Sequence, residues 1–550
     1  MRRSLCAPCL ACLILTGFAG CGNSSTPFNN SADTAGGSLP AQPPSGVSDY
    51  GVSDHAPATP VPKTETEQAQ AFNTESYDHF VDNPFLATRG NPLSTFSIDV
   101  DTASYSIVRR YLNQQQRPPA GAVRIEELIN YFDYRYPQPE QDIPFSVNVE
   151  LSDCPWNTGH KLARIGLKGR EIAAEQRPVS NLVFLLDVSG SMHDANKLPL
   201  VKSAIGLMLE QLSENDRISI VVYAGAAGMV LPPTGAHHKS RIMSAMNQLN
   251  AGGSTNGGEG IELAYNIATE HFIPGGINRV ILCTDGDFNV GGSSHSQLIP
   301  LIQDKARSGV FLSVLGFGMG NLNDSLMEKL ADEGNGNYAY IDTLSEAQKV
   351  LVDQISGTLV TIAKDVKIQV DFNAARVHSY RLIGYENRRL RAEDFQDDSK
   401  DAGEIGAGHT VTALYDIVPV GQESDLPSVT PSKYQQATAA SPEADSNELL
   451  TVRLRYKQPD GQHSREMKMP VIDVERPFVK ASQDLQFAAA VAAFGMLLRE
   501  SKHKGSATWD DVIDIARKNL GDDPHGYRRE FIGLAEQARA FGPRQVVLQP

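Results

Sequence analysis

The stretch from Asn181 to Met192 reads NLVFLLDVSGSM, and it decides how this chain folds. Its first part, up to Val188, is a near-continuous apolar run, the pattern of a strand buried on both faces of a parallel sheet. The end of this run and the residues after it contain Asp187, Ser189 and Ser191. Their spacing lets one carboxylate and two hydroxyls converge in the loop that leaves the strand. These hard oxygen donors suit a hard divalent cation.

Two later stretches supply further oxygen donors. Residues 252–258, GGSTNGG, form a glycine-rich stretch that offers Thr255. Residues 279–284, RVILCT, form a second buried-strand pattern, which is followed directly by Asp285. Because loops at the carboxyl ends of strands line one crevice in an open α/β sheet, we expect all three stretches to meet there.

With these motifs, residues 178–357 resemble a von Willebrand factor type A (VWA) domain. The alternation of strand and helix patterns agrees with the doubly wound α/β sheet that this resemblance implies. The resemblance also implies a metal-ion-dependent adhesion site (MIDAS), whose metal ligands would be Asp187, Ser189, Ser191, Thr255 and Asp285. Two carboxylates and three hydroxyls favour Mg²⁺ or Mn²⁺ over Ca²⁺, which takes more oxygen ligands. In the family, an open metal position accepts an acidic side chain from a partner protein.

Alternating apolar residues flank the VWA domain on both sides. Residues 145–151 and 162–168 precede it, and residues 366–372, 411–417 and 450–456 follow it, each with the pattern of a half-buried antiparallel strand. Inter-alpha-trypsin inhibitor heavy chains are similar in placing a VWA domain beside β-rich segments. We therefore expect a β-sandwich-like region that the VWA domain interrupts, with two separate small β units as the alternative.

The regions at the two ends of the body have helical patterns. The sequences STFSIDVDTASY, RIEELINYFDY, FAAAVAAFGMLLRES and DPHGYRREFIGLA resemble the corresponding regions of YfbK-type bacterial proteins that carry a VWA domain. The aspartates Asp99 and Asp101 could suggest a second metal site, but Asp101 or Thr102 as the cap of the following helix is the favoured interpretation.

The N-terminus has the pattern of an export signal. A basic start, an apolar stretch over residues 10–18 and the sequence FAGC at 18–21 resemble a bacterial lipoprotein signal, cleaved before Cys21, which would carry the lipid. A plain secretory signal with a free Cys21 is the alternative. Gly22 after the cysteine resembles the sorting pattern for the outer membrane of a Gram-negative bacterium. The following stretch is rich in Ser, Thr, Pro and Gly, as in a disordered tether.

These patterns divide the chain into six parts. They are a signal peptide at 1–20, a tether at 21–75, a family N-terminal region at 76–140, a β-rich region at 141–177 and 358–475, the VWA domain at 178–357 and a helical region at 480–550.

The composition of the chain limits the classes of partner that it is expected to bind. The formal net charge of −16 argues against nucleic acid as a partner. We expect a lipid-anchored extracytoplasmic protein that touches the membrane only through its lipid and binds a partner protein through the metal. The alternatives are an envelope scaffold with a purely stabilising metal, or a metal-dependent hydrolase with His193 or Glu259 as its base. An enzyme is not favoured, because the sequence has no nucleophile elbow and no phosphate-binding loop.

Overall fold

The computed structural model describes residues 74–140, 143–255, 257–286, 295–422, 426 and 441–542. All of these residues belong to one compact unit, Gln70–Pro550. The predicted signal peptide, Cys21 and nearly all of the predicted tether therefore lie outside the described residues. Within the described ranges, no helix combines the length and the apolar character needed to cross a membrane.

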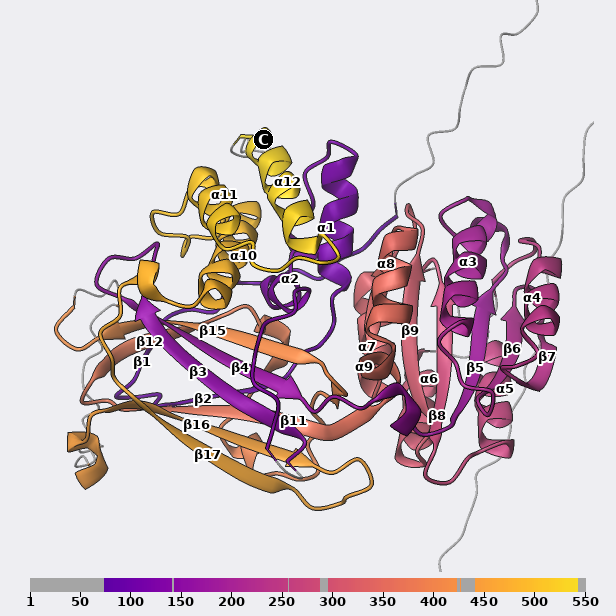
Figure 1. The fold of residues 1–550 in the computed structure, drawn as a ribbon, viewed down its shortest axis with the longest axis horizontal. Coiled ribbons are helices and arrows are strands. Elements are labelled where there is room, and N and C mark those ends of the chain that lie inside the picture. Colours follow the sequence, from indigo (N-terminus) through magenta and orange to yellow (C-terminus); the bar gives the residue numbers. More distant parts are fainter. Residues whose placement is uncertain are drawn as a thin grey trace, which may run out of the picture. The chain divides into compact units, whose positions relative to one another are not determined.

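A six-stranded sheet forms the centre of the VWA domain (Figure 1). Its strands lie in the order β10 (Tyr338–Ile341), β9 (Phe311–Phe317), β8 (Ile277–Thr284), β5 (Ser180–Asp187), β6 (Arg217–Tyr223) and β7 (Ala227–Gly235). Every neighbouring pair is parallel except β6 and β7. Strands β5 and β8 are buried along their whole length, which confirms the expected α/β sheet.

Helices cover both faces of this sheet. Strand β5 has apolar side chains on both faces, and alternate residues pack into two separate cores. Leu182, Phe184 and Leu186 pack in the core that includes α3 (Leu198–Leu209), α4 (Lys239–Gln248) and α8 (Leu344–Gln348). Val183 and Leu185 pack in the core on the other face. That second core is built from α1 (Ala103–Asn113), α5 (Gly257–Glu270), α6 (His295–Arg307) and α7 (Asp324–Glu333).

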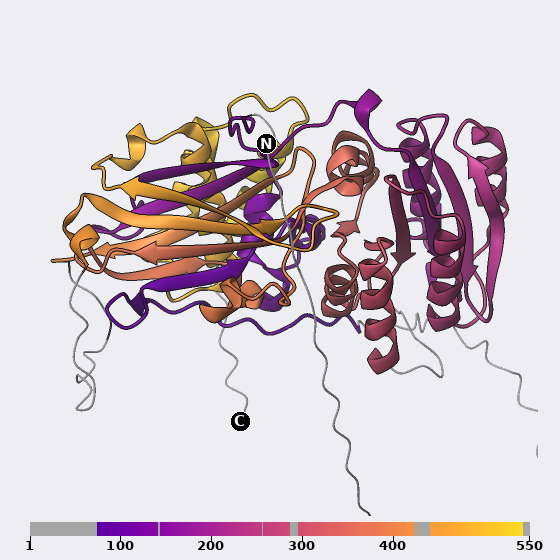
Figure 2. The same cartoon turned by 90° about the horizontal axis from the view of Figure 1, so that it is seen from below.

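Two further sheets make up the β-rich region (Figure 2). The first has the order β1 (Leu86–Ala87), β12 (Val377–Ile383), β15 (Thr410–Pro419), β4 (Lys161–Gly169) and β3 (Phe145–Asp153). The second has the order β13 (Arg389–Leu390), β2 (Leu93–Ser97), β11 (Thr361–Phe372), β16 (Glu448–Lys457) and β17 (Arg465–Ile472), and β14 (Ile405–Gly406) also pairs with β11.

Strands from before and after the VWA domain share these two sheets. Strand β4, before the domain, pairs along its length with β15, and β2 pairs with β11. Aromatic contacts join the facing sheets: the ring centroids of Phe372 and Tyr380 are 3.9 Å apart, and those of Phe145 and Tyr456 are 4.8 Å apart. The VWA domain is thus inserted between β4 and β11 of one sandwich.

The C-terminal helices form a core of their own with the N-terminal region. Helices α10 (Gln483–Arg499), α11 (Trp509–Lys518) and α12 (Tyr527–Arg539) pack with α2 (Ile125–Asn130). Gly495 of α10 lies against α2, where an added Cβ would come within 2.9 Å of Ile125 Cγ1 and 3.1 Å of Leu128 Cδ1. The short α9 (Ile355–Leu359) precedes β11.

We predict that Gly495→Ala destabilises the body by about 1–3 kcal/mol, because the new methyl group overpacks the contact between α10 and α2. Gly533→Ala in α12 is the matched control, since a Cβ there meets nothing within 4 Å. It should stabilise by about 0.5–1 kcal/mol through helix propensity alone. Urea unfolding of both variants measures the difference, and equal stabilisation by the two would contradict the close approach.

Candidate metal centre

Asp187 is the last residue of β5, and the chain turns directly after it. Its Oδ1 accepts a hydrogen bond from the backbone N–H of Ser189 at 2.8 Å, which folds the following loop back over the strand end. The hydroxyl oxygens of Ser189 and Ser191 lie 3.0 Å apart. Asp187 and Ser189 are buried and Ser191 is exposed. The group therefore runs from a buried carboxylate to a hydroxyl at the surface.

Asp285 supplies the second carboxylate. It follows Thr284, the last residue of β8, which is the parallel neighbour of β5. The Thr284 hydroxyl donates to Asp187 Oδ2 at 3.4 Å, and Ser191 hydrogen-bonds with the Asp285 carboxylate. The two strand ends thus bring Asp187, Ser189, Ser191 and Asp285 together at one point of the sheet edge.

The Thr255 loop lies against the loop that leaves β5. The Gly252 N–H donates to Val188 O at 2.7 Å, and the Gly190 N–H donates to Gly253 O at 3.1 Å. Thr255 itself is half-buried at the end of this loop, next to the start of α5. Among the described residues, Thr255 forms no hydrogen bond to the other four predicted ligands, and it is the backbone of its loop that joins the group.

The two carboxylates differ in their electrostatics. Burial raises the pKa of Asp187 to about 6, and the charge of Asp285 adds to this, although hydrogen bonds from Ser189 and Tyr223 oppose it. Burial also acts to raise the pKa of Asp285, but hydrogen bonds from Lys197 and Asn321 outweigh it and hold that pKa below its usual value. The negative charge that lacks compensation is therefore on Asp187.

Three polar residues complete the surroundings of the carboxylates and have no counterpart in the sequence prediction. The Tyr223 hydroxyl donates to Asp187 Oδ2 at 3.1 Å. Lys197 Nζ donates to Asp285 Oδ2 at 2.8 Å and to Asn321 Oδ1 at 3.2 Å. Tyr223 ends the strand beside β5, a position that could have been identified from the predicted strands. Lys197 and Asn321 lie in loops without a local signal.

The loop that holds Asn321 also contacts the start of the described chain. Thr74 N–H donates to Gly320 O at 2.8 Å, and Glu75 Oε1 accepts from the Gly320 N–H at 2.8 Å. Glu75 also forms an ion pair with Arg110 of α1 at 2.7 Å. Placing Thr74 and Glu75 in the tether was therefore wrong. The polar composition there gave no sign of a buried partner contributed by α1.

A second group of carboxylates lies apart from the first. Asp99, Glu127 and Glu328 are buried, and their oxygens lie within 4.8 Å of one another, close enough to hold a metal ion. Arg388 pairs with Asp99 at 3.3 Å and with Glu328 at 3.0 Å, and Arg124 pairs with Glu127. With two guanidinium groups inside it, this cluster is accounted for as an ion-pair network.

The predicted helix cap next to this network is only partly correct. Thr102 occupies the N-cap position of α1, but its side chain makes no capping hydrogen bond. The carboxylate of Asp101 instead accepts the N–H of Tyr338 at 2.8 Å, which joins the N-terminal region to β10. The tertiary contact displaces the local cap, because the segment before α1 packs against the VWA sheet.

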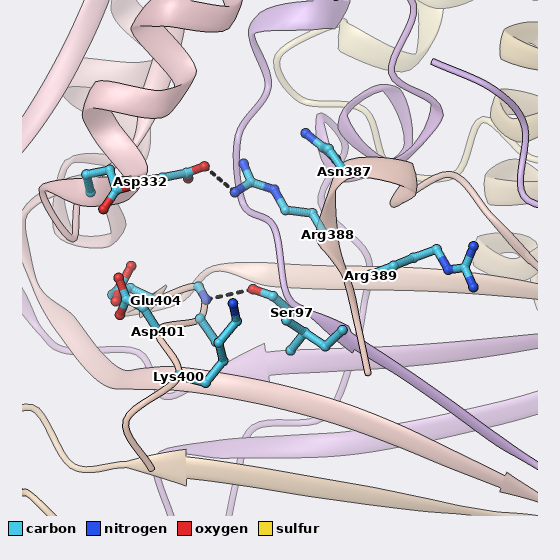
Figure 3. A pocket seen from close by; sticks show the side chains of 12 residues that line it. Ser97, Asp332, Asn387, Arg388, Arg389, Lys400, Asp401 and Glu404 are labelled. Carbon is cyan, nitrogen blue, oxygen red and sulfur yellow. Dashed lines mark hydrogen bonds and ion pairs between the residues drawn. The ribbon is translucent and has the colours of Figure 1, made fainter. Parts of the chain in front are cut away.

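A polar cavity of about 320 Å³ lies beside this network, between the end of α7 and residues 387–404 (Figure 3). Arg388 forms an ion pair with Asp332 on its wall, and the Gly403 N–H donates to Ser97 Oγ at 2.7 Å. Burial and nearby carboxylates raise the pKa of Glu404 well above its usual value. None of the five predicted metal ligands, all of them described, lines this cavity.

Three family models match the chain. The von Willebrand factor type A domain matches residues 181–356, a model described as von Willebrand factor matches residues 71–164, and "Uncharacterized protein YfbK, C-terminal" matches residues 357–541. The first of these shows that the chain contains a VWA domain, as the sequence motifs predicted. Together with the sheet topology, it confirms the predicted fold class.

Several known proteins are similar to parts or to most of this chain. "Uncharacterized protein YfbK" of Escherichia coli (strain K12) is 44% identical over 473 residues, which cover 84% of this chain and 81% of the relative. Human inter-alpha-trypsin inhibitor heavy chain H4 is 25% identical over 232 residues, 40% of this chain and 25% of the relative. A solved von Willebrand factor type A structure from Catenulispora acidiphila is 15% identical with a TM-score of 0.41, covering 75% of this chain and 100% of that one.

We predict that Glu126, beside the second carboxylate group, makes the stability depend on pH. Burial, then the charges of Glu386 and Asp99, raise its pKa to about 8. Because the pKa of Glu126 in the folded protein lies above the usual 4.5, its contribution to the stability of the fold is complete at low pH. That contribution is lost as pH rises toward 8. Glu126→Gln should remove this loss and raise the melting temperature at pH 8 relative to wild type.

Glu127→Gln is the matched control for this prediction. Glu127 is equally buried, and burial likewise raises its pKa to about 8, but it pairs with Arg124 and accepts the Ser104 N–H at 2.8 Å. Its replacement should destabilise by about 1–3 kcal/mol, because it leaves a buried cation short of a partner. Thermal melting of both variants at pH 6 and pH 8 separates the effects. An equal loss of stability in both variants at pH 8 would contradict the role of Glu126.

Proposed function

Because the chain belongs to the YfbK family and carries a VWA domain, we propose that it binds a partner protein through a divalent metal. Domains of this type commonly mediate protein interactions through such a site. The metal would be held by Asp187, Ser189, Ser191, Thr255 and Asp285. The observation that carries the proposal is the convergence of two carboxylates and two hydroxyls at the ends of β5 and β8.

The chemistry of the donors fits a hard divalent cation. All of the donors are oxygens, and Asp187 is a buried carboxylate that no lysine or arginine pairs with in the described part of the chain. A bound cation would supply the missing positive charge. Mg²⁺ or Mn²⁺ suits so few carboxylates better than Ca²⁺. The exposed Ser191 marks the side from which an acidic side chain of a partner would approach.

The position of the site within the sheet also supports binding. The strands after β5 run to one side of it through β6 and to the other through β8, so β5 lies where the strand order reverses. Ligands of open α/β sheets bind at this point, outside the carboxyl ends of the strands. The hydrolase alternative has weaker support, because His193 and Glu259 are both exposed and neither bonds to a predicted ligand among the described residues.

The N-terminal sequence supports attachment to a membrane through lipid. From the FAGC motif we infer cleavage before Cys21 and attachment of lipid to its thiol. The lipid would tether the body in the cell envelope, at the outer membrane. A body held in this way meets its partner by reaching across the envelope. A scaffold whose metal only stabilises the loops would share this location, so location alone does not decide between the two functions.

We predict that Cys21→Ser moves the protein from the membrane fraction to the soluble fraction, because the hydroxyl cannot take the place of the lipidated thiol. Cell fractionation with immunoblotting measures the shift, and Cys154→Ser is the matched control because Cys154 is buried in the body. Retention of Cys21→Ser in the membrane fraction would contradict lipid anchoring and leave the metal-dependent binding untouched.

We predict that Asp187→Ala abolishes metal-dependent partner retention, because it removes the buried carboxylate of the site. The full chain in detergent, wild type or variant, is used to capture proteins from an envelope extract with Mg²⁺ or with EDTA, and mass spectrometry identifies what is retained. A protein retained only by wild type with Mg²⁺ would establish the function. Glu262→Ala, on α5 beyond the Thr255 loop, is the control for loss of a carboxylate elsewhere in the domain.

Equal retention in every arm of this experiment would overturn the proposal. The binding surface would then lie away from the metal, and the metal would be a stabilising component of the scaffold. Melting of wild type with and without Mg²⁺ tests that alternative directly. A rise in melting temperature with Mg²⁺, without any effect on retention, is the result that a scaffold predicts.

A further inference from the structure

Lys197 is a buried cation held in contact with the candidate metal centre. It is the N-cap residue of α3, is 4% exposed, and its Nζ donates to Asp285 Oδ2 at 2.8 Å. The loop after β9 covers its side chain so closely that a Cβ at Gly318 would lie 2.3–2.8 Å from three of its carbons. The ammonium group is thus fixed against one carboxylate of the site by the packing of its own stem.

The charges of the site are set by this contact. Asp187 and Asp285 contribute two negative charges and Lys197 contributes one positive charge, which leaves one negative charge in excess. A divalent cation would convert this excess into a net positive charge. In the absence of Lys197, the same cation would be neutralised by the two carboxylates, and the site would have no net charge to attract an acidic group.

We propose that Lys197 is a resident cation that lowers the affinity of the site for the divalent metal and keeps the loaded site positive, so that it selects an acidic ligand. The inference rests on the proposed metal site. Lys197 competes with the metal ion for Asp285. It also repels the metal ion, because charges interact strongly in a poorly solvated site. The same positive charge strengthens the attraction for a carboxylate that reaches the metal.

A purely structural role is the competing explanation. Lys197 also donates to Asn321 at 3.2 Å, so it could serve only to hold the loop after β9 in place. In that case, its removal would loosen Asp285 and weaken metal binding. The two roles therefore predict opposite changes in metal affinity, and a titration with metal alone distinguishes them.

The test is a calorimetric titration of the full chain with Mn²⁺. Lys197→Met keeps the length and apolar character of the stem and removes the charge, and Lys197→Gln is a second uncharged variant that can still donate to Asp285. Both should bind Mn²⁺ about tenfold more tightly than wild type. Lys197→Arg keeps the charge and should stay within about threefold of wild type.

Lys202→Met is the matched control for loss of a lysine from the same helix. Lys202 Nζ donates to the backbone carbonyl of Leu249 at 2.7 Å and, among the described residues, forms no hydrogen bond or ion pair with the site carboxylates. Its Mn²⁺ affinity should equal that of wild type. Acetate, titrated into the Mn²⁺-loaded proteins and followed by water-proton relaxation, should bind more weakly to both uncharged Lys197 variants than to wild type.

The outcomes separate this inference from the proposed function. Unchanged or weaker Mn²⁺ binding by both folded Lys197 variants, with binding by wild type intact, overturns the role of Lys197 and leaves the metal site standing. Equal Mn²⁺ binding by wild type and Asp187→Ala, or none by either, overturns the metal site itself. Tighter Mn²⁺ binding together with undiminished acetate binding overturns the selection of acidic ligands.

Discussion

Within the described part of the chain, a buried carboxylate without a cationic partner is the constraint on which the candidate site depends. Asp187 is fully buried, and the described groups that donate to it are neutral: the N–H and the hydroxyl of Ser189 and the hydroxyls of Tyr223 and Thr284. Dipoles compensate a buried charge incompletely, so a carboxylate in this position is costly to the fold. A bound cation would offset this cost, which agrees with the proposed role of Asp187 as a metal ligand.

The surrounding fold supplies the rigidity that such a ligand requires. Strand β5 is packed on both faces, and its neighbour β8 fixes Asp285 across a parallel pairing. The VWA domain is in turn held at both ends, because β4 before it and β11 after it are paired within the same sandwich. A site placed on strand ends in this way is positioned more accurately than one built only from loops.

The sequence predicted those parts of the structure that depend on local pattern. The strands at 180–187 and 277–284 carry continuous apolar runs, and the site motif lies directly after them. Helix α6 and strand β17 have no predicted counterpart, and each contains a proline, Pro300 and Pro470, a residue that weakens a helix or strand pattern. As an edge strand, β17 tolerates proline, a fact that only the sheet order reveals.

Local sequence patterns could not identify the residues that set the charge around the site. Lys197 reaches Asp285 across 88 positions of sequence and meets Asn321 from a third loop. No spacing rule connects these positions, because the contact follows from the way α3 and the loop after β9 pack over the sheet. The motif therefore identifies the ligands, whereas the charge that surrounds them is a property of the tertiary structure.

The same loop shows why the N-terminal segment belongs to the body of the protein. Gly318–Asn323 contacts Lys197 on one side and the segment Thr74–Ser76 on the other, through backbone hydrogen bonds and the buried carboxylate of Glu75. Contiguity of this kind is not evidence that the two ends are energetically coupled. It does establish that removing Glu75 would strip a supporting contact from the loop beside Asp285. A shortened protein that keeps this supporting contact must therefore begin at or before Thr74.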